Sequence, residues 1–313
     1  MNLSWDTKEG KLAIGGIIGV VAILAALGAV FFFPRQNDDA YRTIKVYRVE
    51  GTAEVDRPGV GVSAPYVDMM LQNDDRVATM ADGWLYLLMD GSKYLLAEPE
   101  TTFTLQASGT NDSNQTRLSL EAGSLVSHIT EPLSDDSSYE VSTPNSVMAV
   151  RGTSLRVYVW RDEGGVSHTV LQVFEGTVKV RLVYPDGTLS EERAFTAGQV
   201  AYIWGNNVTS DYESTSDEID YYDLETDTLE FLKVGIEGLD DYTLTVPDVD
   251  EIIRLKQTIF TVRFMVGGNV FGTQQVRFGQ RAVEPVLRPT ATGSWDFSFD
   301  TPIRQDTDVH WQE

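Results

Sequence analysis

The stretch S-T-P-N-S-V-M-A-V-R-G-T-S-L-R-V-Y-V, from Ser142 to Val159, indicates the fold class of this chain. Proline disfavours the helical conformation of the residue before it, so Thr143 is extended. Residues 147–150 form an apolar run that is too short for a helix, and Gly152 marks a bend after it. A second strand then alternates between two faces: Leu155, Val157 and Val159 on one, Arg156, Tyr158 and Trp160 on the other.

The same kind of pattern continues on both sides of this stretch. Short strands and Asp-Gly or Pro-Gly turns recur from about residue 45 to residue 203, and no helical periodicity is sustained there. Asp90-Gly91 is the strongest hairpin signal, and Asp186-Gly187 is a second one. Further strands are predicted at Ile44–Val46, Ala53–Val55, Trp84–Met89, Tyr94–Ala97, Phe103–Leu105 and Leu118–Leu120. The region is therefore predicted to be all-β.

Composition excludes several function classes. The 313 residues include 47 Asp and Glu against 24 Lys and Arg, and the net charge is −23. Phosphate backbones select surfaces rich in Lys and Arg, so a nucleic-acid partner is not expected. The chain has no cysteine, which removes disulfides, thiolate nucleophiles and cysteine zinc sites.

Seven sequence pieces follow one another along this region. They are G-T-A-E-V-D-R (51–57), L-Q-N-D-D-R-V-A-T (71–79), L-L-M-D-G-S-K-Y-L-L-A-E-P-E-T (87–101), L-S-L-E-A-G-S-L (118–125), T-P-N-S-V-M-A-V-R-G-T (143–153), V-F-E-G-T-V-K-V (173–180) and A-G-Q-V (197–200). In this order they resemble the FecR-type domain, an extracytoplasmic module of membrane-bound bacterial proteins. The resemblance implies a β-solenoid-like fold, with rungs of short strands stacked around an apolar core.

The end of the signature provides the only candidate binding residues. Arg151, Gly152 and Thr153 are predicted to contact a protein partner, because glycine lets the backbone approach a partner closely. A structural interpretation of Arg151, in which it bonds backbone carbonyls or a nearby carboxylate, is favoured over the binding interpretation.

Residues 12–33 form a stretch of 22 residues without a charge. As a helix it would be about 33 Å long, enough to cross a hydrocarbon core of about 30 Å. A cleaved signal peptide is the alternative, but the apolar run is longer than a signal core and continues to Phe33 past its small residues. We expect an uncleaved anchor, a cytoplasmic tail at residues 1–11 and an extracytoplasmic bulk. FecR proteins that bind a sigma factor carry a larger cytoplasmic domain than eleven residues, so that role is not transferred.

Residues 206–256 contain 15 acidic and three basic residues. We expect the strands to stop here and two short helices to form. The first runs from Thr226 to Gly238, with Leu229, Leu232 and Ile236 on one face, and the second runs from Pro247 to Lys256. A solvated, self-repelling linker is favoured over a calcium site, because the EF-hand spacing is absent.

Residues 259–313 resemble the internalin-type B repeat, also called the Listeria–Bacteroides repeat. The pieces that carry the resemblance are a first strand ending in Gly267-Gly268, the Gln274–Phe278 strand, a proline pair, an aromatic core and T-P-I-R-Q-D-T (301–307). This implies a small ubiquitin-like β-grasp unit. Its large aromatic residues, which are Trp295, Phe297, Phe299 and Trp311, are expected to fill its core.

No catalytic motif is found. The three histidines, His128, His168 and His310, are scattered, and no H-E-x-x-H, G-x-S-x-G or P-loop occurs. His168 is predicted to be a solvated residue of a hairpin loop. We therefore expect a protein that is not an enzyme and has no cofactor or metal.

The sequence as a whole predicts a mainly β, single-pass envelope protein in six parts. These are a cytoplasmic tail (1–11), a transmembrane helix (12–33), a juxtamembrane linker (34–44), a FecR-type domain (45–205), a partly helical acidic connector (206–257) and a B-repeat-like module (258–313). The expected function is sensing, signal transduction or scaffolding through binding of envelope or surface proteins. The alternative is a surface adhesin or wall-binding protein that binds a host or glycan ligand, such as wall polymer, through residues 258–313.

Overall fold

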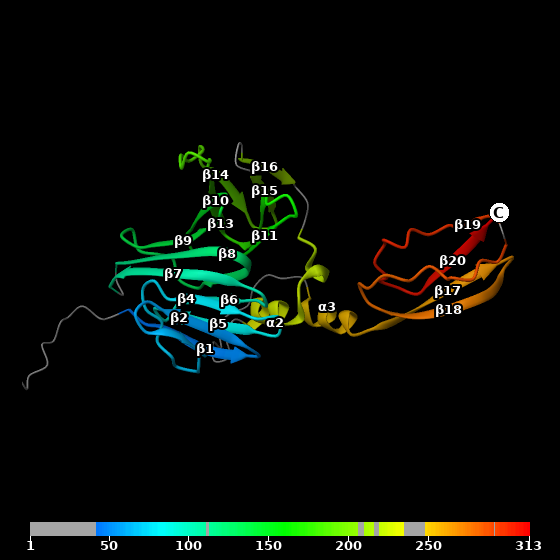
Figure 1. Cartoon of the computed structure of the whole chain (residues 1–313), viewed down its shortest axis with the longest axis horizontal. Helices are drawn as coiled ribbons and strands as arrows, with labels where there is room; N and C mark the ends of the chain where they lie inside the picture. Colours follow the sequence, from blue (N-terminus) through cyan, green and yellow to red (C-terminus); the bar gives the residue numbers. More distant parts are fainter. Residues whose placement is uncertain (1–41, 111–112, 206–209, 216–218, 235–247, 291) are drawn as a thin grey trace, which may run out of the picture. The chain divides into compact units, whose positions relative to one another are not determined.

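The computed structural model describes residues 42–110, 113–205, 210–215, 219–234, 248–290 and 292–313. These residues are mainly β, with two α-helices and one short 3₁₀ helix (Figure 1). The predicted anchor at 12–33 and the tail at 1–11 lie outside the described residues. Within the described ranges, no helix has the length and apolarity that a membrane span requires.

Sixteen strands form one continuous hydrogen-bonded system, drawn in blue to olive in Figure 1. They are β1 (Ile44–Glu50), β2 (Ala53–Arg57), β3 (Gly61–Ser63), β4 (Arg76–Thr79), β5 (Trp84–Met89), β6 (Lys93–Ala97), β7 (Thr102–Gly109), β8 (Asn114–Ile129), β9 (Ser138–Ser142), β10 (Ser146–Val150), β11 (Ser154–Arg161), β12 (Ser167–Glu175), β13 (Thr177–Leu182), β14 (Arg193–Thr196), β15 (Val200–Gly205) and β16 (Ser210–Thr215). The predicted strand positions in the FecR-type region all fall on strands. Strand β16 is an addition to the prediction, which had strands end before residue 210.

The system folds into two layers. Layer A has the order β1-β5-β6-β8-β11-β12-β15-β16, and layer B has the order β3-β2-β4-β7-β8-β9-β10-β13-β14. Fully buried side chains from both layers meet in one core, for example Leu87 and Leu95 from layer A with Phe103 and Val180 from layer B. Strand β8 belongs to both layers: its first half pairs with β7 and β9, and its second half pairs with β6 and β11.

The predicted solenoid is wrong. A solenoid stacks its rungs so that each strand pairs with its equivalent in the next rung, whereas all described pairs among β1–β16 except β8–β9 are antiparallel. Tight turns are the reason. Asp90 and Gly91 both have positive φ, 53° and 75°, which fits a tight hairpin turn, and Met89 pairs with Lys93 across that turn.

A buried amide joins the two layers at the β9–β10 turn. Asn145 donates from Nδ2 to the carbonyl oxygens of Ser167 (3.0 Å) and Ile203 (3.3 Å), on strands β12 and β15 of layer A. Its Oδ1 accepts from the hydroxyls of Thr143 (3.0 Å) and Thr169 (2.8 Å). All four hydrogen-bonding positions of the amide are used inside the protein. The T-P-N-S part of the signature is therefore a brace between layers.

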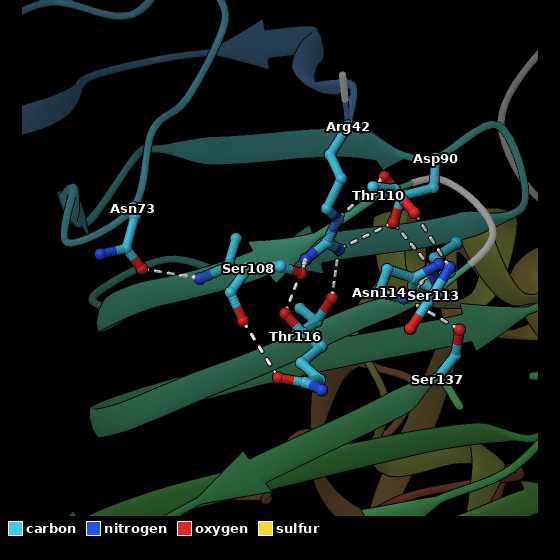
Figure 2. A network of polar contacts seen from close by, with 12 residues as sticks. Arg42, Asn73, Asp90, Ser108, Thr110, Ser113, Asn114, Thr116 and Ser137 are labelled. Carbon is cyan, nitrogen blue, oxygen red and sulfur yellow. Dashed lines mark hydrogen bonds and ion pairs between the residues drawn. The ribbon is translucent and has the colours of Figure 1, made fainter. Parts of the chain in front are cut away.

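Arg42, the first described residue, is clamped to layers A and B by its guanidinium. It forms two hydrogen bonds with the carboxylate of Asp90 (3.2 and 2.7 Å) and donates to the carbonyls of Ser108 (3.0 Å) and Gln115 (2.6 Å). Figure 2 shows Arg42 between Asp90 and the β7–β8 pair. Buried Lys93 donates to the same carboxylate at 2.8 Å. Burial alone would raise the pKa of Asp90, but the bonds from Arg42 and Lys93 outweigh it and hold that pKa below its usual value.

The acidic connector is part of the folded unit. Helices α2 (Thr226–Val234) and α3 (Val249–Lys256) form where the sequence predicts them, and Asp248 caps α3 by accepting from the Glu251 backbone N–H. The predicted positions Ile236, Gly238 and Pro247 lie outside the described residues. The expectation of a solvated linker is wrong for the helices, because their apolar sides pack against the outer face of layer A. The helices contribute Leu229, Phe231, Leu232, Val249 and Ile252 to this core, and layer A contributes Tyr86, Tyr94, Leu96 and Val126.

Residues 258–313 form a separate four-stranded sheet of order β18-β17-β20-β19, in which β17 (Ile259–Val266) and β20 (Thr307–Gln312) are parallel. Strands β18 (Asn269–Arg277) and β19 (Ser294–Trp295) lie at its edges. Trp295 is buried in its core, and Phe297, Phe299 and Trp311 pack against that core as predicted. No helix crosses this sheet in residues 258–290 or 292–313, so the β-grasp assignment stays a prediction.

Replacing the bracing amide should destabilise the two-layer unit. Asn145→Ala leaves two buried hydroxyls and two buried carbonyls short of a partner, so we expect the free energy of unfolding to fall by about 2–4 kcal/mol. Urea unfolding followed by tryptophan fluorescence measures it. Asn73→Ala is the matched control, because exposed Asn73 accepts one hydrogen bond, from the Ala107 backbone N–H, and should cost less than about 1 kcal/mol. Equal losses for the two variants would contradict the bracing role.

Buried His128 should make stability depend on pH. Burial lowers the pKa of this imidazole from 6.5 to about 4, and its Nδ1 shares a hydrogen bond with the Ser154 hydroxyl. Since the unfolded chain binds the proton more readily, stability should be lost as pH falls from 6.5 towards 4, by up to about 3 kcal/mol.

Urea midpoints across that pH interval test this dependence. His128→Asn, which removes the titrating group, should flatten the dependence between the two pKa values. A slope that is the same in His128→Asn and in the unmodified chain would assign the dependence to other groups.

Candidate functional site

The predicted binding residues lie in the turn between β10 and β11, and Arg151 is the most accessible of them. Its Nη2 lies 2.8 Å from Oδ1 of Asp135, and both side chains are exposed. The arginine therefore bonds a nearby carboxylate, as the structural interpretation expects. Surface ion pairs are weak, so the guanidinium could exchange Asp135 for a partner's carboxylate at little cost.

Gly152 and Thr153 have internal roles. Gly152 has φ of 61°, in the left-handed region that favours glycine. Thr153 is buried, and its carbonyl accepts from the Ile129 backbone N–H at 3.1 Å. Its Cγ2 lies 2.5 Å from where a Cβ on Gly176 would be. Arg151 alone of the three could thus touch a partner through its side chain.

A larger feature lies on the outer face of layer A, where three neighbouring strands carry aromatic side chains. Strand register places Trp160 opposite His168, and His168 opposite Trp204, in one row across the sheet. The adjacent row contains Tyr158 and Tyr202, with Val170 of β12 between them. The aromatic face is defined here as Tyr158, Trp160, His168, Tyr202 and Trp204.

Three rings of the aromatic face stack in one column. Tyr158 and Trp160 stack with centroids 5.1 Å apart and planes 21° apart, and Trp160 and His168 stack at 4.9 Å and 12°. The guanidinium of Arg156 lies 5.5 Å from the Tyr158 ring centre, within cation–π range. Tyr158 and Tyr202 are exposed at 38% and 40% of their surface, and the other three side chains are half-buried. Rings that are held in place in this way lose little conformational freedom when a partner covers them.

Charged groups stand at both ends of the stacked column. At one end, Arg156 forms two hydrogen bonds with the buried carboxylate of Glu98 (2.9 and 2.7 Å), and Thr228 of α2 donates to the same carboxylate at 2.6 Å. Burial alone would raise the pKa of Glu98, but Arg156 and Thr228 hold that pKa below its usual value of 4.5. Stability from this contact is therefore complete above about pH 4.5 and is lost as pH falls through the lowered pKa.

At the other end, His168 Nε2 lies 3.0 Å from the Asp162 carboxylate. This hydrogen bond is the main cause that lowers the pKa of Asp162, and the backbone N–H of Val166 adds to it. His168 lies on strand β12, so its predicted position in the hairpin loop is wrong. The surface thus joins rigid aromatic rings with a cation at one edge and a carboxylate at the other.

Sequence reasoning missed the aromatic face although its signal was present. Alternation in β11 places Tyr158 and Trp160 on the polar side of the strand, which faces away from the core. The same alternation in A-Y-I-W (201–204) places Tyr202 and Trp204 outward. What the sequence lacks is the neighbour relation, because β15 joins β12 only through the long-range pairing of the sheet.

The three histidines lie on three different strands, β8, β12 and β20. Ser154 and His128 form a hydroxyl–imidazole pair, but both are almost completely buried, so a substrate could not reach them. His310 pairs with Asp296 at 3.4 Å on the small sheet, far along the chain from the other histidines. No cluster of three metal-ligating side chains is found in the described part of the chain.

Comparison with known proteins agrees with part of the sequence prediction. The model of the FecR protein family matches residues 75–179, which are 105 of the 313 residues. The match lies inside the predicted FecR-type region and includes Arg151 and β11. The prediction of a FecR-type domain is therefore confirmed for residues 75–179. The B-repeat-like module at 258–313 stays a prediction. No curated protein matches the chain.

Two crystal structures from Parabacteroides distasonis ATCC 8503, both of proposed anti-sigma factors, are similar to the chain. Their sequence identities are 14% and 12%, and the alignments cover 64% and 76% of this chain and 84% and 98% of those chains. The TM-score is 0.37 in both cases, too low to define a common fold.

Removing the Arg151 guanidinium should separate its binding role from its structural role. Both partners of the Arg151–Asp135 pair are exposed, so Arg151→Ala should change the free energy of unfolding by less than about 1 kcal/mol. Urea unfolding measures this change, with Asp135→Ala as the matched control. A loss above about 2 kcal/mol would show that the arginine is a structural residue and remove it as a candidate contact.

Proposed function

We propose that this chain is a non-enzymatic, membrane-anchored protein of the bacterial cell envelope that binds another envelope protein in signal transduction or scaffolding. The aromatic face is the observation that carries this proposal. Tyrosine, tryptophan and arginine are the residue types that contribute most of the binding energy in protein interfaces. Here they lie side by side, ordered and partly exposed, on a rigid sheet.

The match to the FecR family supports the signal-transduction part. The matched residues 75–179 contain Tyr158, Trp160 and His168, three of the five residues of the aromatic face. The other two, Tyr202 and Trp204, lie beyond the match. A protein partner also suits the charge of the chain. With a net charge of −23, the protein repels nucleic acid, whereas Arg156 and Asp162 at the edges of the face offer both signs to a partner.

In this proposal the membrane is reached through residues 12–33, with residues 1–11 in the cytoplasm and the β layers outside. The apolar length of 22 residues is the support for the span. The signal would be transmitted either through the short cytoplasmic tail or through assembly of envelope proteins around the aromatic face.

A second candidate function, adhesion or wall binding, is favoured by one observation on residues 258–313. The loop that follows β18 exposes three apolar side chains, and Val286 is 98% exposed. The others are Val283 and Leu287. Exposed apolar clusters commonly mark ligand or partner contacts, so the test below includes this loop.

Site-specific photo-cross-linking in intact cells tests the proposal. A photoreactive amino acid placed at Tyr158 or at Tyr202 should capture the same envelope protein, because the two positions lie in one row of the aromatic face. Lys179, an exposed residue on the outer face of layer B, is the control position and should capture much less of it. Capture at Val286 reports on the alternative.

The outcomes separate the two functions. A partner that is captured equally from position 179, or no capture from positions 158 and 202, would contradict binding by the aromatic face. Capture of only wall polymer or host protein, from position 286, would support adhesion. Protease added to intact cells, with any outer barrier opened, checks the orientation, since complete protection of the β layers would contradict an extracytoplasmic bulk.

A further inference from the structure

A short loop at one edge of layer B exposes an unusual amount of apolar surface. Residues 58–70, P-G-V-G-V-S-A-P-Y-V-D-M-M, contain β3 and connect β2 towards β4. Val60 is 80% exposed and Tyr66 is 65% exposed. The other exposed apolar side chains of this segment, named the apolar loop below, are Val62, Val67 and Met70.

The base of the apolar loop is rigid. Arg57, just before the loop, forms two hydrogen bonds with the carboxylate of Asp75 (2.9 and 2.7 Å) and donates to the carbonyl of Met70 at the loop's other end (2.8 Å). Asp75 is fully buried and also accepts from the Gln72 backbone N–H at 2.8 Å. The guanidinium thus ties the two ends of the loop together, and the exposed apolar side chains are held on a fixed support.

The loop lies beside the first residues of the folded domain. The backbone N–H of Val46 donates to the carbonyl of Met69 (2.9 Å), and the N–H of Leu71 donates to the carbonyl of Ile44 (2.8 Å). Arg42, two residues before Ile44, is fixed by the clamp on Asp90. The point at which the chain joins the domain is therefore close to the base of the apolar loop.

Chain length limits how far that point can lie from a bilayer. The apolar stretch ends at Phe33, so only the eight residues 34–41 separate it from Arg42. Eight residues span at most about 28 Å when fully extended. If residues 12–33 cross the membrane, Arg42 lies within about 28 Å of the lipid surface, and the base of the apolar loop is close to the same point of the chain.

The charge of the loop is compatible with lipid contact. Its single side chain that is charged at neutral pH is Asp68, which pairs with Lys45 of β1 at 3.1 Å. Insertion of the valines and Tyr66 would therefore not place an unpaired charge in the bilayer, which is the costly step for lipid-facing groups. Tyrosine is also enriched at the level of the lipid headgroups.

We propose that the apolar loop inserts its exposed side chains into the lipid interface beside the anchor and so fixes the domain against the membrane. This inference rests on the membrane anchoring included in the proposed function. Contact through apolar side chains predicts binding to uncharged phosphatidylcholine surfaces and little effect of salt, since attraction to anionic lipid makes no contribution.

The test uses the full chain in two sets of phosphatidylcholine vesicles, one of which contains a nitroxide-labelled phosphatidylcholine that quenches nearby fluorophores. The natural chain has no cysteine, so Val60→Cys and Val67→Cys each give one labelling site for the fluorophore NBD. Glu163→Cys is the matched control. Glu163 is exposed and follows Arg161, the last residue of β11. Ile44 pairs with Met89, Lys93 pairs with Ile129, and Ser154 pairs with His128. These pairs place Ser154, the first residue of β11, at the same end of layer A as Arg42, so Glu163 lies towards the opposite end.

Insertion into the headgroup and acyl boundary should reduce NBD emission at positions 60 and 67 by at least about twofold in the nitroxide-containing vesicles, relative to the unlabelled vesicles. Emission at position 163 should change by less than about a tenth, because that end lies beyond the interface. High salt should leave both results unchanged.

The alternative outcomes are distinguishable. If the chain floats with the vesicles but positions 60 and 67 are quenched no more than position 163, the inference fails and the anchoring stands. If the chain does not float with the vesicles, the anchoring fails and the inference falls with it. A blue-shifted emission at 60 and 67 without lipid quenching would mean that protein covers the loop, and would also overturn the inference.

Discussion

The two-layer unit depends on one strand that serves both layers. Strand β8 hydrogen-bonds to β7 and β9 in layer B along its first half and to β6 and β11 in layer A along its second half. The change occurs at Gly123, which has φ of 81°, and a Cβ there would lie 2.4 Å from the Cα of Thr101. Because no other residue fits that position without displacing backbone, the bend, the core between the layers and the place of β11 all follow from it.

The FecR-type signature at residues 143–153 and the aromatic face consist of different residues. In the signature, Thr143, Asn145 and Thr153 are buried, and the amide of Asn145 uses its full hydrogen-bonding capacity inside the protein. Buried polar groups of this kind define how the layers meet. The side chains that we propose for partner binding are outward residues of β11, β12 and β15, outside the buried part of the signature. A shared signature is therefore compatible with different partners.

Much of the fold could be predicted because its determinants are local. The short apolar segments Trp84–Met89 and Tyr94–Ala97, the Asp90-Gly91 turn and the helical spacing of Leu229 and Leu232 each lie within a few residues, and each predicted element is present. The predictions that failed needed non-local information. The direction of strand pairing decided against the solenoid, and the apolar sides of α2 and α3 had no visible partner until layer A was folded. The aromatic face was invisible for the same reason, since Trp160 and Trp204 are brought together only by β12 between them.

The packing of α2 and α3 shows that the region matched by the family model is shorter than the unit that folds around one set of packed side chains. The family match ends at residue 179, but Leu229, Phe231 and Ile252 share a core with Tyr94 and Val126 of layer A, and Thr228 bonds the Glu98–Arg156 pair. A fragment trimmed to the family's boundary would expose an apolar sheet face and leave a buried carboxylate with fewer partners. Helices α2 and α3 of the acidic segment are therefore part of the fold, with their apolar residues packed on layer A and with Glu230 and Asp250 exposed to water.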